Sequence, residues 1–171
     1  MTASAYDHLR VLIVEDNNHM RTLLRSLMNA LGIRQVIECT DGASAYAALR
    51  DRKPDFVLTD LSMKPVDGIE FTRMVRTAKD SPNPYVPIVM VTGHTERGRV
   101  EAARDAGVTE FIAKPITVQN LLLRVAEIVE RPRPFVRCHS YFGPDRRRHK
   151  DADYVGPWRR QDDIMDDVAI I

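Results

Sequence analysis

The sequence predicts an α/β fold in which five βα units form a doubly wound parallel sheet, followed by a C-terminal arginine-rich tail. From residue 9 to residue 130, short apolar runs alternate with amphipathic segments of helical length, a pattern typical of βα units around a parallel sheet. Some runs are continuously apolar, as expected of strands covered on both faces. At 171 residues the chain has room for one well-packed domain and an appendage.

The apolar runs place the five strands. We expect them at residues 11–14, 35–38, 56–59, 88–91 and 110–113. Right-handed crossovers between parallel strands then put helices on both faces of the sheet, and any site belongs at the carboxyl ends of the strands.

Helical periodicity and stop signals place the five helices. The first is expected over 17–31, where Leu24, Leu27 and Leu31 share one face and Gly32 follows as a stop. The second, over 41–50, opens on a capping Asp41. The other three are expected at 68–78, 95–106 and 117–130. The Arg-Pro-Arg-Pro run at 131–134 ends the last helix and sets the boundary between a domain at 8–130 and a tail at 131–171.

The composition predicts the cellular compartment, and its overall charge balance conceals a locally basic tail. The chain has 25 Lys and Arg against 24 Asp and Glu, but residues 131–160 carry nine basic groups and only three Asp. Cys39 and Cys138 form no metal-type spacing, which predicts a reduced, cytosolic protein. No apolar run approaches the roughly 18 residues that a membrane-spanning helix needs, so we expect no membrane insertion.

Charged and hydroxyl side chains follow the expected strands. Glu15 and Asp16 come after the first strand, and Asp60, Thr92 and Lys114 come after the third, fourth and fifth. Adjacent carboxylates repel one another and therefore favour a hard divalent cation such as Mg²⁺, which also binds phosphate oxygens. Asp60 is the expected nucleophile toward a phosphodonor, with Lys114 and the Thr92 hydroxyl holding the transferred phosphoryl oxygens.

This set of residues resembles the receiver domain of two-component response regulators of the CheY kind, over roughly residues 8–130. The resemblance implies a flavodoxin-like (βα)5 fold, a histidine kinase that phosphorylates Asp60, and a non-enzymatic role in the turnover sense. It implies that Asp16 and Asp60, with the backbone carbonyl of Ser62 and help from Glu15, hold Mg²⁺. It also implies a cis peptide bond between Lys114 and Pro115.

Phe111 falls where the receiver family has its switch aromatic, three residues before Lys114. In the family, phosphorylation draws the threonine inward and the ring follows, which changes the face made by the fourth helix, fifth strand and fifth helix. The alternative is that Phe111 is simply a half-buried strand residue, and the sequence leaves both open.

The tail contains the motif Tyr-x-Gly-Pro-x-Arg-Arg twice, at 141–147 (the first arginine motif) and at 154–160 (the second arginine motif). Each offers an aromatic face, a restricted Gly-Pro turn and paired guanidinium groups that fork onto phosphate or onto guanine O6 and N7. Two copies suggest a ligand with two equivalent halves. Cyclic di-GMP fits, with two guanines and two phosphates.

The expected ligands of cyclic di-GMP come from both motifs. Arg146, Arg147, Arg159 and Arg160 are the principal anion and guanine ligands, and Tyr141, Tyr154 and Trp158 are expected to stack. Asp145 is expected to accept from the guanine N1–H and N2–H₂ edge. Arg148 and Arg137 are secondary candidates, and the turns are formed by Gly143, Pro144, Gly156 and Pro157.

A CheY-like receiver with this extension resembles the Cle family of cyclic di-GMP effectors. The resemblance implies that the tail binds cyclic di-GMP, including as an intercalated dimer, and that the loaded protein associates with the flagellar motor switch at the flagellated pole to modulate swimming and surface attachment. We expect the tail to be disordered until the ligand binds. The closing residues 168–171 could dock as a strand or as a helical turn.

Two other functions compete with this one. The chain could be a stand-alone phosphorelay receiver phosphorylated at Asp60, with an incidental tail. The basic tail could instead bind nucleic acid through its charge alone, which predicts steep salt dependence. We rank both lower, because binding by counterion release needs charge and not a repeated Gly-Pro register.

Overall fold

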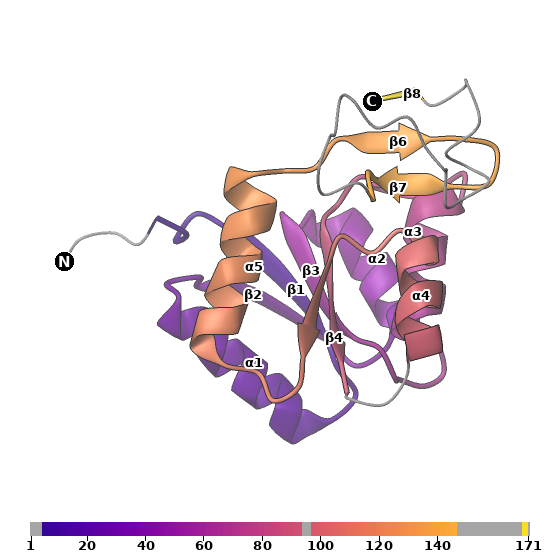
Figure 1. Ribbon diagram of the computed structural model, residues 1–171. Coiled ribbons are helices and arrows are strands. Elements are labelled where there is room, and N and C mark those ends of the chain that lie inside the picture. Colours follow the sequence, from indigo (N-terminus) through magenta and orange to yellow (C-terminus); the bar gives the residue numbers. More distant parts are fainter. Residues whose placement is uncertain (1–4, 94–96, 147–168, 171) are drawn as a thin grey trace.

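The computed structural model describes residues 5–93, 97–146 and 169–170. Its centre is a five-stranded parallel sheet in the order β2-β1-β3-β4-β5 (Figure 1). The strands are β1 (Arg10–Val14), β2 (Gln35–Cys39), β3 (Phe56–Asp60), β4 (Ile88–Thr92) and β5 (Glu110–Ala113). All five expected strands are confirmed, each within a residue of its predicted bounds.

Helices cover both faces of this sheet. They are α1 (Asn18–Ala30), α2 (Gly42–Arg52), α3 (Gly68–Thr77), α4 (Arg97–Ala106) and α5 (Val118–Glu130). Four of them begin after a side chain that accepts a hydrogen bond from the first turn: Asn17, Asp41, Asp67 and Thr117. The predicted cap at Asp41 is therefore confirmed. Residues 95 and 96, predicted to open the fourth helix, lie outside the described residues.

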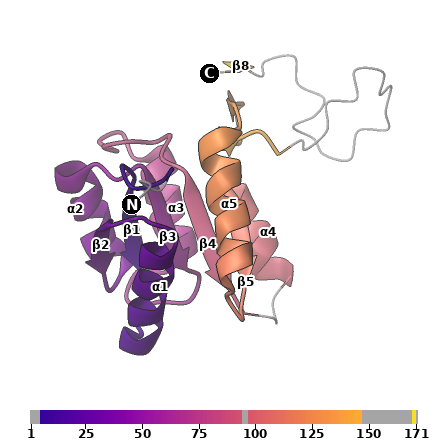
Figure 2. The ribbon, with the colours of Figure 1, turned by 90° about the vertical axis from the view of Figure 1, so that its left-hand side faces the viewer.

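The sheet divides the core into two layers. On one face, α1 and α5 pack on β1, β3 and β4 through residues such as Leu24, Leu121 and Ile13, and Figure 2 shows both helices on the near side of the sheet. On the other face, α2 and α3 cover the sheet through Leu49 and Phe71, while α4 joins α3 there in a smaller apolar cluster. This double cover explains why β3 and β4 are buried throughout.

The chain beyond α5 folds back onto the domain. Strands β6 (Phe135–Arg137) and β7 (Phe142–Pro144) form an antiparallel hairpin, and β8 (Ala169–Ile170) pairs with the outer side of β6. Of the two options for the closing residues, the strand is the one observed. The hairpin lies beyond the amino ends of β4 and β5, at the opposite end of the sheet from Asp60 (Figure 1).

Aromatic rings attach this hairpin to the domain. The rings of Phe135 and Phe142 lie 5.3 and 5.4 Å from that of Tyr85, in edge-on arrangements, measured between ring centroids. The buried guanidinium of Arg76, on α3, stacks over the Phe135 ring and donates to the carbonyl oxygens of Gly107 and Pro84. The expectation of a tail that is disordered before ligand binding is therefore wrong for 135–146, because burial of these rings offsets the ordering cost.

A buried carboxylate fixes the direction in which the chain leaves α5. Glu110, the first residue of β5, is almost fully buried and pairs with Arg124 of α5 and with Arg133 just beyond that helix. Removing Arg133 would take away one of the two cations that pair with this buried carboxylate, which is costly. The segment after α5 is therefore attached to the domain at Arg133, three residues beyond the helix. Within the described residues, no helix combines the length and apolar character of a membrane span.

Candidate functional site

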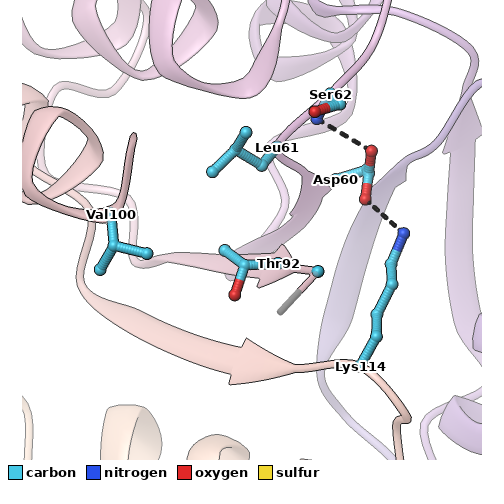
Figure 3. A pocket seen from close by; sticks show the side chains of 7 residues that line it. Asp60, Leu61, Ser62, Thr92, Val100 and Lys114 are labelled. Atoms are coloured by element: carbon cyan, nitrogen blue, oxygen red, sulfur yellow. Dashed lines mark hydrogen bonds and ion pairs between the residues drawn. The ribbon is translucent and has the colours of Figure 1, made fainter. Parts of the chain in front are cut away.

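The predicted carboxylate site assembles at the carboxyl ends of the parallel strands. Asp60 ends β3, Thr92 ends β4, Glu15 follows β1 and Lys114 follows β5. A cavity of about 210 Å³ opens there, lined by Asp60, Leu61, Ser62, Thr92, Gly93, Val100 and Lys114 (Figure 3). The segments at residues 60–62, 92–93, 100 and 114, which are distant in the sequence, thus meet at this cavity, and Glu15 lies outside its lining.

Asp60 is held in a fixed orientation by two hydrogen bonds. Its side chain is buried, with 5 % of the residue exposed. The Nζ of Lys114 donates to Oδ1 at 2.7 Å, and the backbone N–H of Ser62 donates to Oδ2 at 2.9 Å (Figure 3). A buried carboxylate is tolerated only when it is paired in this way. The arrangement presents one oriented anionic nucleophile beside one cation.

Glu15 supplies a second carboxylate that is incompletely paired. The residue is 2 % exposed, and its Oε1 accepts from the N–H of Asn17 at 3.1 Å. Its Oε2 is buried and has no hydrogen-bond partner among the residues that the structure describes. Burial raises the pKa of Glu15, and the nearby charges of Asp60 and Asp16 raise it further, against the opposing effects of the Asn17 bond and Lys114. An additional cation would relieve this accumulation of negative charge.

The donor set therefore fits a hard divalent cation such as Mg²⁺. Buried Glu15 and Asp60 bring carboxylate oxygens to one place, and Asp16 is exposed beside them. Among the described residues, no three His, Cys, Asp or Glu side chains already stand as a complete metal-binding group. The ligand set of Glu15, Asp16, Asp60 and the Ser62 carbonyl thus stays a prediction, supported by the unpaired Glu15 oxygen.

Thr92 and Phe111 are the two residues predicted to respond to phosphorylation of Asp60. Thr92 is buried and lines the cavity. Phe111 is half-buried and packs against the apolar cluster of α3, β4 and α4 that includes Leu61 and Met90. This packing is compatible with both predicted roles of Phe111, as a switch or as an ordinary strand residue. The expected cis bond between Lys114 and Pro115 is confirmed, and Lys64–Pro65 is also cis.

Sequence reasoning missed Arg99, which ties α4 to the loop after Asp60. Its Nη1 donates to Ser62 Oγ at 2.8 Å, and its Nη2 pairs with Asp67 Oδ2 at 2.9 Å. A basic residue on an amphipathic helix gives no signal of such a contact, because the contact depends on how α3 and α4 pack.

The first arginine motif lies on the hairpin, away from the Asp60 pocket. The hydroxyl of Tyr141 donates to the carbonyl oxygen of Pro144 at 2.8 Å, and its ring is buried beneath the guanidinium of Arg146. The backbone N–H of Asp145 donates to the carbonyl oxygen of Pro134. At Gly143, any Cβ would come within 2.5 Å of the Tyr141 hydroxyl. The Tyr141 ring therefore stacks on an arginine of its own motif.

The remaining predicted ligand-binding residues cannot be placed in this geometry. Arg147, Arg148, Tyr154, Gly156, Pro157, Trp158, Arg159 and Arg160 lie outside the described residues. Their roles stay predictions. Of the first arginine motif, only residues 141–146 are described.

Comparison with known proteins agrees with the predicted receiver fold. The family model described as the response regulator receiver domain matches residues 11–126. The chemotaxis protein CheY of Pseudomonas aeruginosa is 34 % identical over 123 residues, covering 72 % of this chain and 98 % of that protein. CheY-3 of Vibrio cholerae is 32 % identical over 131 residues, covering 77 % and 99 %.

Solved structures give the same result. The receiver domain of a sensor histidine kinase from Pseudomonas aeruginosa, solved with a magnesium ion coordinated in its active-site cleft, superposes with a TM-score of 0.61 at 29 % identity. That match covers 70 % of this chain and 94 % of the other. Vibrio cholerae CheY4 gives a TM-score of 0.64 at 26 % identity, covering 71 % and 98 %. Motif, geometry and relatives agree, and this chain belongs to the response regulator receiver domain family.

Proposed function

We propose that this CheY-like receiver is phosphorylated on Asp60 by a histidine kinase and that its arginine-rich extension binds cyclic di-GMP. The loaded protein would then act on the flagellar motor switch at the flagellated pole and modulate swimming and surface attachment. The phosphotransfer part is carried by the Lys114–Asp60 pair in its polar cavity. The nucleotide part is carried by the repeated Tyr-x-Gly-Pro-x-Arg-Arg motif.

Asp60 is arranged to act as the nucleophile. A carboxylate oxygen of Asp60 forms a bond to phosphorus while the bond from phosphorus to the donor histidine nitrogen breaks, and that nitrogen keeps the electron pair. The Ser62 N–H and the Lys114 ammonium already contact the two carboxylate oxygens. As charge moves onto the phosphoryl group, Lys114 and the Thr92 hydroxyl, which line the same cavity, would bind its oxygens.

Mg²⁺, when bound by Glu15, Asp16, Asp60 and the Ser62 carbonyl, would neutralise charge on the phosphoryl oxygens. The chain's own contribution is to concentrate carboxylates where that ion is needed. The buried, unpaired Oε2 of Glu15 supports this assignment, since such an atom is rare unless an ion or water completes its bonding.

One experiment, run on the wild type and on Asp60→Asn, tests the phosphotransfer step. Purified full-length protein is treated with acetyl phosphate and Mg²⁺, and phosphorylation is measured by intact mass. We expect one added phosphoryl group on the wild type and none on Asp60→Asn. Addition to Asp60→Asn at the wild-type level would show that another residue accepts the group.

One observation favours the stand-alone relay as a second candidate. Residues 135–146 pack on the domain through Phe135, Tyr141 and Phe142, so part of the extension is explained by folding alone. That role does not explain why the second arginine motif repeats the first. A relay without ligand binding would phosphorylate normally and give no heat with cyclic di-GMP.

A further inference from the structure

The guanidinium of Arg146 is already occupied by groups of its own protein. Its centre lies 3.7 Å from the centroid of the Tyr141 ring. Its Nη1 lies 3.1 Å from Oδ1 of Asp105, near the end of α4, and only 16 % of the Arg146 side chain is exposed. Arg146 of the first arginine motif is therefore already paired with a carboxylate of the receiver domain.

The Tyr141 ring and the hairpin residues that hold it form a platform under Arg146, and this platform does not depend on Asp105. Tyr141 is fixed from below by its hydroxyl bond to the Pro144 carbonyl oxygen, and the Tyr141 carbonyl oxygen accepts from the N–H of Cys138 at 2.9 Å. The Phe135 and Phe142 rings pack on Tyr85 independently of α4. Removing the Asp105 charge should therefore leave the hairpin docked and Arg146 still stacked on its ring.

Asp105 is, in contrast, a partner that can be replaced. Its side chain is 61 % exposed, so water can solvate the carboxylate when the pair opens. A carboxylate, a phosphate and the O6/N7 edge of guanine all accept from the same guanidinium N–H groups. Arg146 also keeps a buried Nε that has no partner among the described residues, so its donors are not exhausted by Asp105.

We propose that Asp105 is an internal competitor for Arg146, which a phosphate or guanine edge of the ligand must displace. This inference rests on the proposed binding of cyclic di-GMP and adds a residue of the receiver domain to it. Asp105 weakens ligand binding by neutralising Arg146, and ligand binding breaks the ion pair that joins α4 to the hairpin. The receiver domain thus takes part in setting the affinity of its own extension.

The test is calorimetric titration of the full chain with cyclic di-GMP, comparing wild type with Asp105→Asn. Because exposed ion pairs are weak, we expect Asp105→Asn to bind about two- to fivefold more tightly. The matched control is Glu101→Gln, an exposed position one turn earlier on α4 that changes net charge equally. Equal gains in both variants, or no gain in Asp105→Asn, would overturn the inference.

Hydrogen exchange guards against a folding artefact. In Asp105→Asn without ligand, the amides of Cys138 and Asp145, which are bonded within the hairpin, should stay as protected as in the wild type. If their protection is lost, the assumption of an independent platform is wrong and the inference falls with it.

The outcomes also separate this inference from the proposed function. A wild type that binds, with Asp105→Asn no tighter, rejects only the competitor. If the wild type gives no binding heat and Asp105→Asn binds, the competitor is supported, with a larger effect than expected. If neither protein gives binding heat, both the competitor and the proposed binding of cyclic di-GMP are rejected.

Discussion

Lys114 Nζ lies 2.7 Å from Asp60 Oδ1, although the two residues are 54 positions apart in the sequence. The contact exists because β3, which ends at Asp60, and β5, which Lys114 directly follows, run parallel and end at the same edge of the sheet. It gives the proposed phosphoacceptor its cation before any phosphodonor arrives. Several outcomes can be predicted from this geometry.

Lys114→Ala should impair phosphorylation more than folding. The variant removes the cation that would bind the transferred phosphoryl oxygens, a kind of loss that costs on the order of 10²-fold in rate when one stabilising donor is removed. We expect a comparable fall in the rate of phosphorylation by acetyl phosphate, followed by intact mass. Because Lys114 is partly exposed, circular dichroism should show a folded protein. A rate within about twofold of wild type would contradict the assigned role.

Glu15 should make stability depend on pH and on Mg²⁺. Its pKa is raised in the folded protein, chiefly by burial, so the folded state holds the Glu15 proton more tightly than the unfolded state does. Without Mg²⁺, its contribution to stability is therefore greatest at low pH and is lost as pH rises from the usual value of 4.5 through the raised pKa.

The corresponding variant is Glu15→Gln, measured by thermal unfolding at neutral pH. Without Mg²⁺ it should be more stable than wild type by about 1 kcal/mol, since an incompletely paired buried charge is removed. Added Mg²⁺ should raise the wild-type midpoint more than that of the variant. A midpoint in Glu15→Gln that rises as much as in wild type would exclude Glu15 from the metal site.

Gly143→Ala should loosen the hairpin without touching the Asp60 pocket. The new Cβ would lie 2.5 Å from the Tyr141 hydroxyl and 3.0 Å from the Gly107 Cα. Overpacking of this kind typically costs about 1–3 kcal/mol, which denaturant unfolding would detect. Gly98→Ala is the control, because its Cβ meets nothing within 4 Å among the described residues. Equal stability of the two variants would contradict the described packing of Tyr141.

Truncation should separate the structural part of the extension from the rest. A chain that ends at 130 loses Arg133, which pairs with the buried Glu110, and Phe135, which covers Arg76. We expect it to be less stable than a chain that ends at 146, by about 1.5–3 kcal/mol, since one of the two cations paired with the buried Glu110 is removed while Arg124 remains. Equal unfolding midpoints in urea would show that the hairpin adds nothing to the domain.

How far the sequence predicted this protein depends on the range of the interactions. The five βα units were predictable because apolar periodicity is local, and the Asp60 site followed because parallel strands gather the residues at their carboxyl ends. The hairpin was not predicted. Its strands have three residues each, and the arginines around them resemble a solvated tail.

Individual contacts across packed elements were equally invisible in the sequence. Arg99 meets Ser62 only because α4 lies beside the loop after β3, and Arg146 meets Asp105 only because the hairpin reaches the end of α4. The buried Arg76 is similar, because a basic residue on α3 gives no sign that the carbonyl oxygens of Gly107 and Pro84 will accept from two of its nitrogens. Phe135, Tyr141 and Phe142 were the available clue, since three aromatics within eight positions favour burial.

The most direct test of the central claim is calorimetric titration of the full chain with cyclic di-GMP, beside the double variant Arg146→Ala/Arg159→Ala and beside cyclic di-AMP. We expect saturable binding of cyclic di-GMP by the wild type and its loss in the double variant. We also expect little or no binding of cyclic di-AMP, which has the phosphates but lacks the guanine edge. No heat with wild type, or binding that survives both substitutions, would contradict it.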